Sequence, residues 1–328
     1  MKFSITRAGH IEYRVTDLGR AREFYHDILG FVEIDRDEQR LYLGGLEERE
    51  HHGFVLRKAD SPGVSHLAFR VADPGDLERL AALYQENGCP TRWVPEGYEK
   101  GQGRALRVQD PTGLPLEFYH QIETREWMLQ RFDQYRGANV MRLDHFNCQV
   151  ARVQEAYDWF TKTLGFYTSE ITVTDDDPPS LWAAWLHRKQ NVHDIALMNG
   201  TGPRLHHAGF WLADQASVLR ACDVLAATGY ADSIERGPGR HGISNAFFVY
   251  LRDPDGNRIE LYTSDYMIPE PDWGPVRWSI NDPRRATFWG HKPPTSWFEE
   301  ASLVESIETG EFMPTSPAPL RDRPEFVT

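Results

Sequence analysis

The sequence predicts an α+β fold made of four copies of one βαβββ unit, followed by a C-terminal tail. Four strand-like segments recur, at residues 9–15, 65–71, 144–150 and 206–212, and each alternates apolar and polar residues with the period of a half-buried strand. A segment of helical period follows each of them. The second and fourth copies then close with hairpins whose turns are rich in Asp, Pro and Gly. Repetition of the whole pattern predicts duplicated modules.

The helices are predicted from apolar spacing and from glycine stops. Leu18, Ala21 and Phe24 share one helical face in the first copy, and Gly30 follows as the C-terminal stop. The third copy repeats this arrangement, with Gly165 in the equivalent place. Helices of the same kind are expected before the remaining glycine stops, Gly88 and Gly229.

The copies are expected to pair into two domains. The predicted boundaries are 1–120 for the first domain, 121–141 for a linker, 142–264 for the second domain and 265–328 for the tail. We expect the linker to be helical around 127–135. The tail is rich in Pro and Trp and has no helical period before 297–308, which predicts an extended wrap with one short helix. Its segments 272–275 and 314–324 are expected to be partly disordered.

Composition limits the classes of function. The net charge of −13 argues against a nucleic-acid partner, which requires a basic surface. The three cysteines are isolated, so neither a disulfide framework nor a thiolate metal site is expected. No apolar run approaches the ~20 residues of a membrane span, and the N-terminus has no signal-peptide pattern. We therefore expect a cytoplasmic protein without a membrane partner.

Two histidines and one glutamate are candidate metal ligands. Strand alternation places His145 and His207 opposite the packed apolar face, whereas it places His206 with that face. Glu260 lies in the closing hairpin of the fourth copy and points the same way. Two histidines and a carboxylate are the ligand set of non-haem Fe(II) oxygenases, which leave positions open for other ligands. The same ligands would also suit zinc in a hydrolase.

The first domain repeats these ligand types as His10, His66 and Glu117. A second metal site is therefore a hypothesis. Arg107 takes the place that Tyr250 has in the fourth copy, and Arg14 and Arg70 share the same strand faces as the candidate ligands. Fixed cations here would repel a divalent metal and pair with the carboxylates instead. We expect this set to form a salt-bridged core that holds no catalytic metal.

The residues around the candidate ligands resemble a known family. The runs 143–147, 185–190, 192–194, 204–207 and 234–262 are similar to extradiol catechol dioxygenases of the vicinal-oxygen-chelate superfamily. Among these, the similarity is greatest to the enzymes that act on homoprotocatechuate (3,4-dihydroxyphenylacetate). The resemblance implies O2-dependent 2,3-cleavage to 5-carboxymethyl-2-hydroxymuconate semialdehyde, Fe(II) or Mn(II) as cofactor, a homotetramer, and a tail that contributes to the active site and the subunit interface.

The resemblance also implies roles for single residues. The implied metal ligands are His145, His207 and Glu260. The implied catalytic residues are His193 as acid and base, Tyr250 as donor to the substrate oxygen, His241 beside it and Asn147. The implied substrate contacts are Trp185, Arg236 and a second arginine. An alignment gap leaves that second arginine as Arg284 or Arg285, with Arg284 slightly preferred.

Several alternatives stay open at the level of sequence. The same chemistry on another catechol, such as protocatechuate or one with a neutral side chain, fits the same ligands. A glyoxalase-like isomerase or lyase is the alternative in another reaction class, although such sites commonly use four protein ligands. A noncatalytic binding module would leave His193, Tyr250 and His241 unexplained. The choice between Fe(II) and Mn(II) is not determined by the ligand types.

Overall fold

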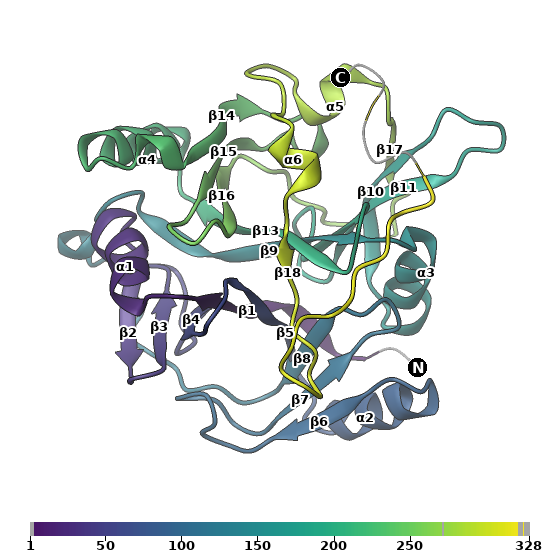
Figure 1. Cartoon of the computed structure of the whole chain (residues 1–328), viewed down its shortest axis with the longest axis horizontal. Coiled ribbons are helices and arrows are strands. Elements are labelled where there is room, and N and C mark those ends of the chain that lie inside the picture. Colours follow the sequence, from purple (N-terminus) through teal and green to yellow (C-terminus); the bar gives the residue numbers. More distant parts are fainter. Residues whose placement is uncertain (1–2, 271, 321–323, 325–328) are drawn as a thin grey trace.

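A computed structural model describes residues 3–270, 272–320 and 324 of the chain (Figure 1). The predicted α+β fold of four βαβββ copies is confirmed. The first copy contains β1 (Ile5–Val15), α1 (Leu18–Arg22) with a π-helical extension (Glu23–Ile28), β2 (Val32–Arg36), β3 (Arg40–Gly44) and β4 (Phe54–Lys58). The second contains β5 (Gly63–Val71), α2 (Asp76–Glu86), β6 (Thr91–Val94), β7 (Ala105–Gln109) and β8 (Pro115–Tyr119).

The other two copies follow the same order. The third contains β9 (Val140–Val150), α3 (Val153–Asp158) with a π-helical extension (Trp159–Thr163), β10 (Tyr167–Val173), β11 (Leu181–His187) and β12 (Ile195–Asn199). The fourth contains β13 (Arg204–Leu212), α4 (Gln215–Ala227), β14 (Ile234–Arg240), β15 (Phe247–Arg252) and β16 (Arg258–Thr263). The glycines that end α1 and α3 with their extensions, Gly30 and Gly165, both have positive φ, as a left-handed C-terminal stop requires.

The copies are joined in pairs by their opening strands. One sheet has the order β2-β3-β4-β1-β5-β8-β7-β6, and the other has the order β14-β15-β16-β13-β9-β12-β11-β10-β17. The first strand of each copy pairs in parallel with the last strand of the same copy and antiparallel with the first strand of its neighbour. Each pair of copies therefore brings two opening strands together at the middle of a sheet.

One apolar core lies between the two sheets. Phe69 of the first sheet is 5.6 Å from Phe146 of the second, and Phe54 is 5.2 Å from Phe210, measured between ring centroids. Both pairs belong to a single cluster of buried side chains that draws on all four copies. The faces of the opening strands that point away from this core carry the histidines.

The segment between the sheets differs from the prediction. Residues 121–139 form no strand, and their only helical element is a 3-10 turn, Phe132–Gln134. The predicted helix around 127–135 is wrong. Trp127 and Phe132 are 52% and 73% exposed, so no apolar face is buried that would stabilise a helix of this length.

The tail crosses both halves of the molecule (Figure 1). It adds β17 (Val276–Ser279) to the edge strand β10, forms α5 (Pro283–Ala286) and α6 (Ser296–Glu299), and pairs β18 (Ser302–Leu303) with β13. The predicted helix over 297–308 is confined to α6, because the chain then extends along β13 and Val304 bridges to Val64. Residues 272–275 are described without regular structure, and 321–323 of the predicted 314–324 segment lie outside the described residues.

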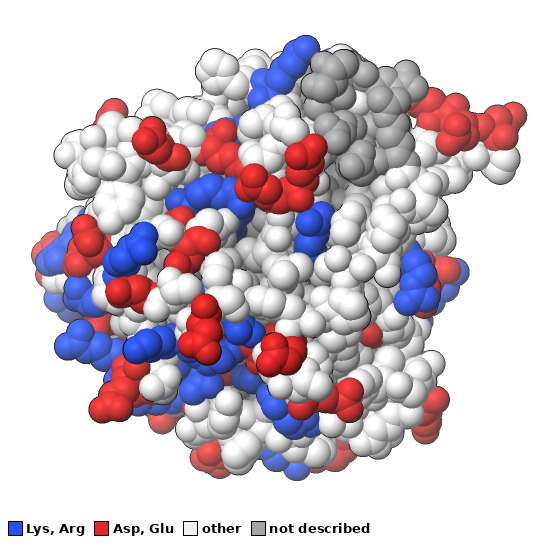
Figure 2. All heavy atoms as spheres, in the orientation of Figure 1, with Lys and Arg blue, Asp and Glu red and all other residues white. Residues whose placement is uncertain are grey.

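The surface carries acidic and basic side chains side by side over the face shown in Figure 2. The loop between β10 and β11, which carries Asp175, Asp176 and Asp177, projects from the body of the protein. Within the described residues, no helix has both the length and the apolar composition needed to cross a membrane.

Candidate active site

The histidines owe their direction to bulges in the opening strands. In each opening strand the pairing register skips the residue directly before the histidine: Gly9, Ser65, Asp144 and His206. A bulge inserts one residue and re-aims the side chains beside it. The simple alternation that placed His206 with the apolar face is therefore wrong. His206 instead lies against the ring of Trp297 in the tail, with centroids 4.3 Å apart.

The three predicted metal ligands, which we call the metal triad, converge. Nε2 of His145 and Nε2 of His207 are 3.4 Å apart, and Oε2 of Glu260 lies 3.1 Å and 3.2 Å from them. A metal bound at about 2.1 Å with angles of roughly 100° separates its ligand atoms by about 3.2 Å. Each of the three side chains is at most 4% exposed. The residues therefore fit a divalent metal without rearrangement.

The ionisation of Glu260 also suits a metal. Burial opposes its charge, but the surrounding imidazoles of His145, His207 and His241 hold the pKa of this carboxyl well below its usual range. A carboxylate that is ionised in a buried site needs cationic or donor partners. The triad supplies one anionic and two imidazole ligands.

A cavity of about 380 Å³ opens on the metal triad. Its walls include all the other predicted site residues except Arg284: Asn147, Trp185, His193, Arg236, His241 and Tyr250. Residues of the tail complete it, among them Arg285, Phe288, Trp289 and Trp297. The sequence pattern did not identify these aromatic residues, because the tail has no repeat or period that fixes which side chains turn inward.

His193 lies beside the triad. Its ring is 3.9 Å from the ring of His145, and its Nδ1 has no hydrogen-bond partner among the described residues. Burial, with a further contribution from His145, holds the pKa of His193 well below its usual value. A neutral imidazole with a free nitrogen is suited to accept a proton at this position.

Tyr250 and His241 form a hydrogen-bonded pair. The Tyr250 hydroxyl lies 2.9 Å from Nε2 of His241, while Nδ1 of His241 contacts the carbonyl oxygen of Ala286. Because a carbonyl only accepts, Nδ1 carries the imidazole proton and Nε2 accepts from Tyr250. Burial, reinforced by the charge of Glu260, raises the pKa of Tyr250 well above its usual value. Tyr250 is therefore a protonated donor.

Two buried arginines face the cavity. Nε and Nη1 of Arg236 and Nε of Arg285 have no hydrogen-bond partner among the described residues. Burial lowers the pKa of each to about 10, and for Arg285 the charge of Arg236 adds to the effect. Buried cations without partners are costly. The pair is therefore suited to an anionic group of a ligand.

The structure corrects the preference for Arg284. That side chain points outward, is 69% exposed, and pairs with Asp282 at 2.8 Å. Arg285 is 4% exposed and lines the cavity. The short helix α5 turns only one of two adjacent side chains inward, and the sequence does not state which one.

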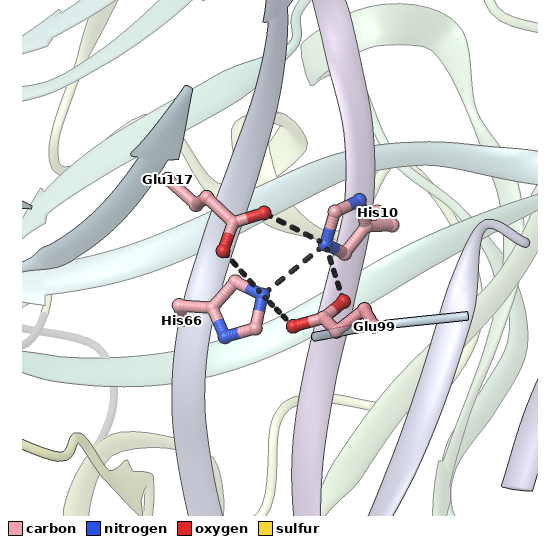
Figure 3. A group of neighbouring side chains, drawn as sticks. All are labelled: His10, His66, Glu99 and Glu117. Carbon is pink, nitrogen blue, oxygen red and sulfur yellow. Dashed lines mark hydrogen bonds and ion pairs between the residues drawn. The ribbon is translucent and has the colours of Figure 1, made fainter. Parts of the chain in front are cut away.

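The equivalent set in the first half is enlarged by an unforeseen residue (Figure 3). His10, His66 and Glu117 meet Glu99, and Nε2 of His10 lies 3.1 Å from Nε2 of His66. Arg107 pairs with both carboxylates, at 2.6 Å to Glu117. We call these five residues the N-terminal cluster. Nothing in the sequence around Glu99 marked it, because it lies in a loop outside the repeated strands.

Of the three arginines predicted beside these carboxylates, two have other partners. Arg14 pairs with Glu305 and Arg70 pairs with Glu50, so neither reaches Glu117. Arg107 takes that role instead. It stands opposite Glu117 on β7, where Tyr250 stands opposite Glu260 on β15. The predicted salt-bridged character of this set thus comes from Arg107.

Comparison with known proteins places the chain in a family. The model of the Glyoxalase/Bleomycin resistance protein/Dioxygenase superfamily matches residues 7–118 and 142–261. A manganese-dependent 2,3-dihydroxybiphenyl 1,2-dioxygenase of Geobacillus genomosp. 3 is 33% identical over 88% of this chain and 95% of its own. A metapyrocatechase of Pseudomonas sp. (strain CF600) is 36% identical over 88% and 95%.

Solved structures agree with this placement. A homoprotocatechuate 2,3-dioxygenase from B. fuscum matches with a TM-score of 0.94 and 40% identity, covering 98% of this chain and 88% of its own. The enzyme of the same name from Arthrobacter globiformis matches with a TM-score of 0.92 and 42% identity, over 96% and 97%. The chain therefore belongs to the Glyoxalase/Bleomycin resistance protein/Dioxygenase superfamily and, within it, to the extradiol catechol dioxygenases.

Proposed function

We propose that this enzyme cleaves 3,4-dihydroxyphenylacetate at its 2,3 bond to give 5-carboxymethyl-2-hydroxymuconate semialdehyde. The observation that carries the proposal is the pair of buried guanidinium groups, Arg236 and Arg285, in the same cavity as the metal triad. A carboxylate on the catechol side chain would supply the acceptors that these donors lack. The solved relatives named for homoprotocatechuate support the same substrate.

We propose His145, His207 and Glu260 as ligands of Fe(II) or Mn(II). Such an ion supplies Lewis acidity toward the catechol oxygens and one-electron chemistry toward dioxygen. Two imidazoles and one carboxylate leave it with net positive charge, which favours an ionised catechol. The manganese dependence named for one relative supports Mn(II) as one of the two.

The remaining residues of the cavity handle protons and orientation. The Tyr250 hydroxyl, held beside His241, is suited to turn its hydrogen from Nε2 of His241 to one catechol oxygen. His193 is neutral and is suited to take the proton that the catechol loses and to return it when the O–O bond breaks. We assign Asn147 and Trp185 to contacts with the bound catechol and dioxygen, as walls of the same cavity.

The substrate assignment is tested by comparing an acidic with a neutral catechol. Arg285→Met should raise KM for 3,4-dihydroxyphenylacetate by about 10- to 100-fold, because charge-assisted hydrogen bonds contribute about 1.5–3 kcal/mol. KM for 4-methylcatechol should change little. Arg284→Met is the matched control, since Arg284 is exposed and pairs with Asp282. Oxygen uptake and formation of the ring-cleavage product measure both reactions.

Each outcome bears on a different part of the proposal. Equal effects of Arg285→Met on the two catechols would refute the carboxylate contact. Failure of the metal-loaded wild type to consume oxygen with any of several catechols would refute ring cleavage itself and would favour the isomerase chemistry known for other members of the fold.

We further propose a homotetramer. Met267, Trp273 and Val276 are 71%, 66% and 47% exposed on the segment that leads into the edge strand β17, and exposed apolar groups of this kind are typical of interfaces. Sedimentation velocity should give about four times the mass of the 37.8 kDa chain. Trp273→Glu should yield a smaller species if this segment contributes to the interface.

A further inference from the structure

A chain of hydrogen bonds leads from the metal triad to the tail through His206. Nδ1 of His207 lies 2.7 Å from Nδ1 of His206, and Nε2 of His206 lies 2.9 Å from the carbonyl oxygen of Trp297. His206 is completely buried. It lines no part of the cavity described above, so it does not touch a reactant.

The protons along this chain follow from the acceptor at its end. A carbonyl oxygen only accepts, so Nε2 of His206 carries a hydrogen. In the neutral ring Nδ1 of His206 is then bare and accepts from Nδ1–H of His207. Nε2 of His207 is left with its lone pair, and this is the atom that faces His145 and Glu260. One backbone carbonyl thus selects the form of His207 that can bind a metal.

We propose that His206 is a positioning residue that fixes the tautomer and the ring orientation of His207. The inference rests on the metal centre proposed above and extends it to a residue outside the cavity. A metal-bound imidazole needs a partner for its second nitrogen, because that partner sets the tautomer and the basicity of the ligand.

The other histidine of the triad has a partner from the same position. Nδ1 of His145 lies 3.2 Å from Oδ2 of Asp144, the residue skipped by the bulge directly before it. His206 is the residue skipped directly before His207. The bulge therefore does two things at once: it aims the histidine and places the preceding side chain against the second ring nitrogen.

The N-terminal cluster offers an internal comparison. Gly9 occupies the skipped position before His10, and Nδ1 of His10 has no hydrogen-bond partner among the described residues. A side chain would not fit there, since a Cβ on Gly9 would lie 2.1 Å from the Tyr119 hydroxyl. Only in the half of the chain with the metal triad do both histidines therefore have a partner for Nδ1, among the described residues.

The two partners of the triad are chemically different. Asp144 is a carboxylate, whereas His206 is a neutral imidazole, so His145 receives the stronger electron donation. His206 also depends on the tail. Nη1 of Arg258 donates to the carbonyl oxygens of both His206 and Glu300, at 3.1 Å and 3.0 Å. The position of the tail and the tautomer of His207 are therefore linked.

Two isosteric substitutions separate the functions of the His206 ring. The side-chain oxygen of Asn can occupy the position of Nδ1 and accept from His207, whereas the amide of Gln reaches the position of Nε2 and donates to Trp297. We expect His206→Gln to weaken Mn(II) binding by about 10- to 100-fold, the usual effect of losing such a partner. His206→Asn should stay within about threefold of wild type. Electron paramagnetic resonance of free Mn(II) gives both dissociation constants.

The outcomes distinguish this inference from the proposed function. Equal affinities in the two variants, whether both weakened or both unchanged, would overturn the role of His206, and so would the reverse order. Failure of the wild type itself to bind Mn(II) would overturn the metal centre and the inference with it. Similar unfolding midpoints are expected for both variants.

A measurement on the wild type covers the case in which a variant does not fold. In the diamagnetic Zn(II)-loaded protein, 15N NMR of labelled histidines should find His206 protonated at Nε2 and His207 protonated at Nδ1. A His206 ring protonated at Nδ1 would overturn the inference directly.

Discussion

The ring of His145, the first metal ligand, has space only because Gly209 has no side chain. Gly209 stands opposite His145 in the β9–β13 pairing, and a Cβ at this position would lie 2.1 Å from Cε1 of the His145 ring. Real atoms do not approach so closely, so either the ring or the strand would have to move. The triad tolerates little movement, because its ligand atoms already have the separations that binding to one shared metal ion requires.

Gly209→Ala is therefore expected to damage the metal site more than the fold. The ring of His145 would turn away from Glu260, and Mn(II) affinity should fall by at least tenfold, with a loss of about 1–3 kcal/mol in the free energy of unfolding from overpacking. Gly274→Ala is the control, since a Cβ there meets no atom within 4 Å. Unchanged Mn(II) affinity in Gly209→Ala would show that the strand, and not the ring, gives way.

His193 is expected to act without holding the metal. His193→Asn should leave the metal content unchanged and lower the rate of oxygen consumption by about 10²- to 10⁴-fold, the usual contribution of a general acid and base. Metal analysis and oxygen uptake on the same preparation measure the two quantities. Loss of metal in this variant would instead make His193 a ligand.

At the scale of single residues, the sequence predicted which residues form the site better than it predicted the directions of their side chains. His145, His207 and Glu260 were identified by repetition and alternation, and the structure brings them together. Alternation failed for His206 because a bulge changes the period by one residue, which is invisible in a pattern of apolar and polar letters. The sequence also could not decide between Arg284 and Arg285, which are adjacent residues of the same type.

Among the secondary-structure elements, those around the cavity are tied together by Glu235. This residue of β14 accepts hydrogen bonds from Arg252 of β15, Arg258 of β16 and Ser296 of α6. Burial opposes its ionisation, but the hydrogen bonds and charge of Arg258 dominate and lower the pKa of Glu235 to about 2. Three elements of the site wall thus depend on one carboxylate.

The pH dependence of stability follows from this shift. A carboxyl with a pKa of about 2 in the folded protein and about 4.5 in the unfolded chain stabilises the fold above pH 4.5. This stabilisation is lost as the pH falls from about 4.5 to about 2. Glu235→Gln should lower the free energy of unfolding by about 3 kcal/mol at pH 7, and by about half as much at pH 3.

Urea denaturation at both pH values measures this difference. Glu308→Gln is a suitable control, because Glu308 is exposed and does not bond to Glu235 or its partners. A difference between wild type and Glu235→Gln that stays constant from pH 7 to pH 3 would show that the carboxylate contributes by packing and not by its charge.

Element prediction succeeded where periodicity and burial agree. The opening strands and the helices that follow them have an apolar face that packs into the shared core, so their pattern is preserved in the structure. The segment around Trp127 and Phe132 has apolar residues without a surface to cover, and no helix forms. The tail pairs with strands far away in sequence, and such pairing leaves no local pattern.

On the scale of the whole molecule, the two halves repeat one architecture with different charges. The N-terminal cluster has ligand types at separations like those of the triad (Figure 3). Arg107, however, bonds both of its carboxylates. Burial disfavours a charged His10, yet Glu117 and Glu99 outweigh it and raise the pKa of His10 to about 9. Arg107 offsets part of the charge of Glu99 and Glu117, and the metal triad has, among the described residues, no such cation bonded to its carboxylate, so the N-terminal cluster attracts a divalent ion less strongly.

We therefore expect one metal ion per chain. Loading with Mn(II) should give one equivalent in the wild type and close to none in His145→Ala. His66→Ala should still bind one equivalent and should differ from the wild type only in its stability. Arg107→Met tests the charge argument directly: without the guanidinium, the buried carboxylates Glu99 and Glu117 lose their strongest cation, and a second equivalent of Mn(II) should bind. Two equivalents in the wild type, reduced to one by His66→Ala, would instead make the N-terminal cluster a metal site in its own right.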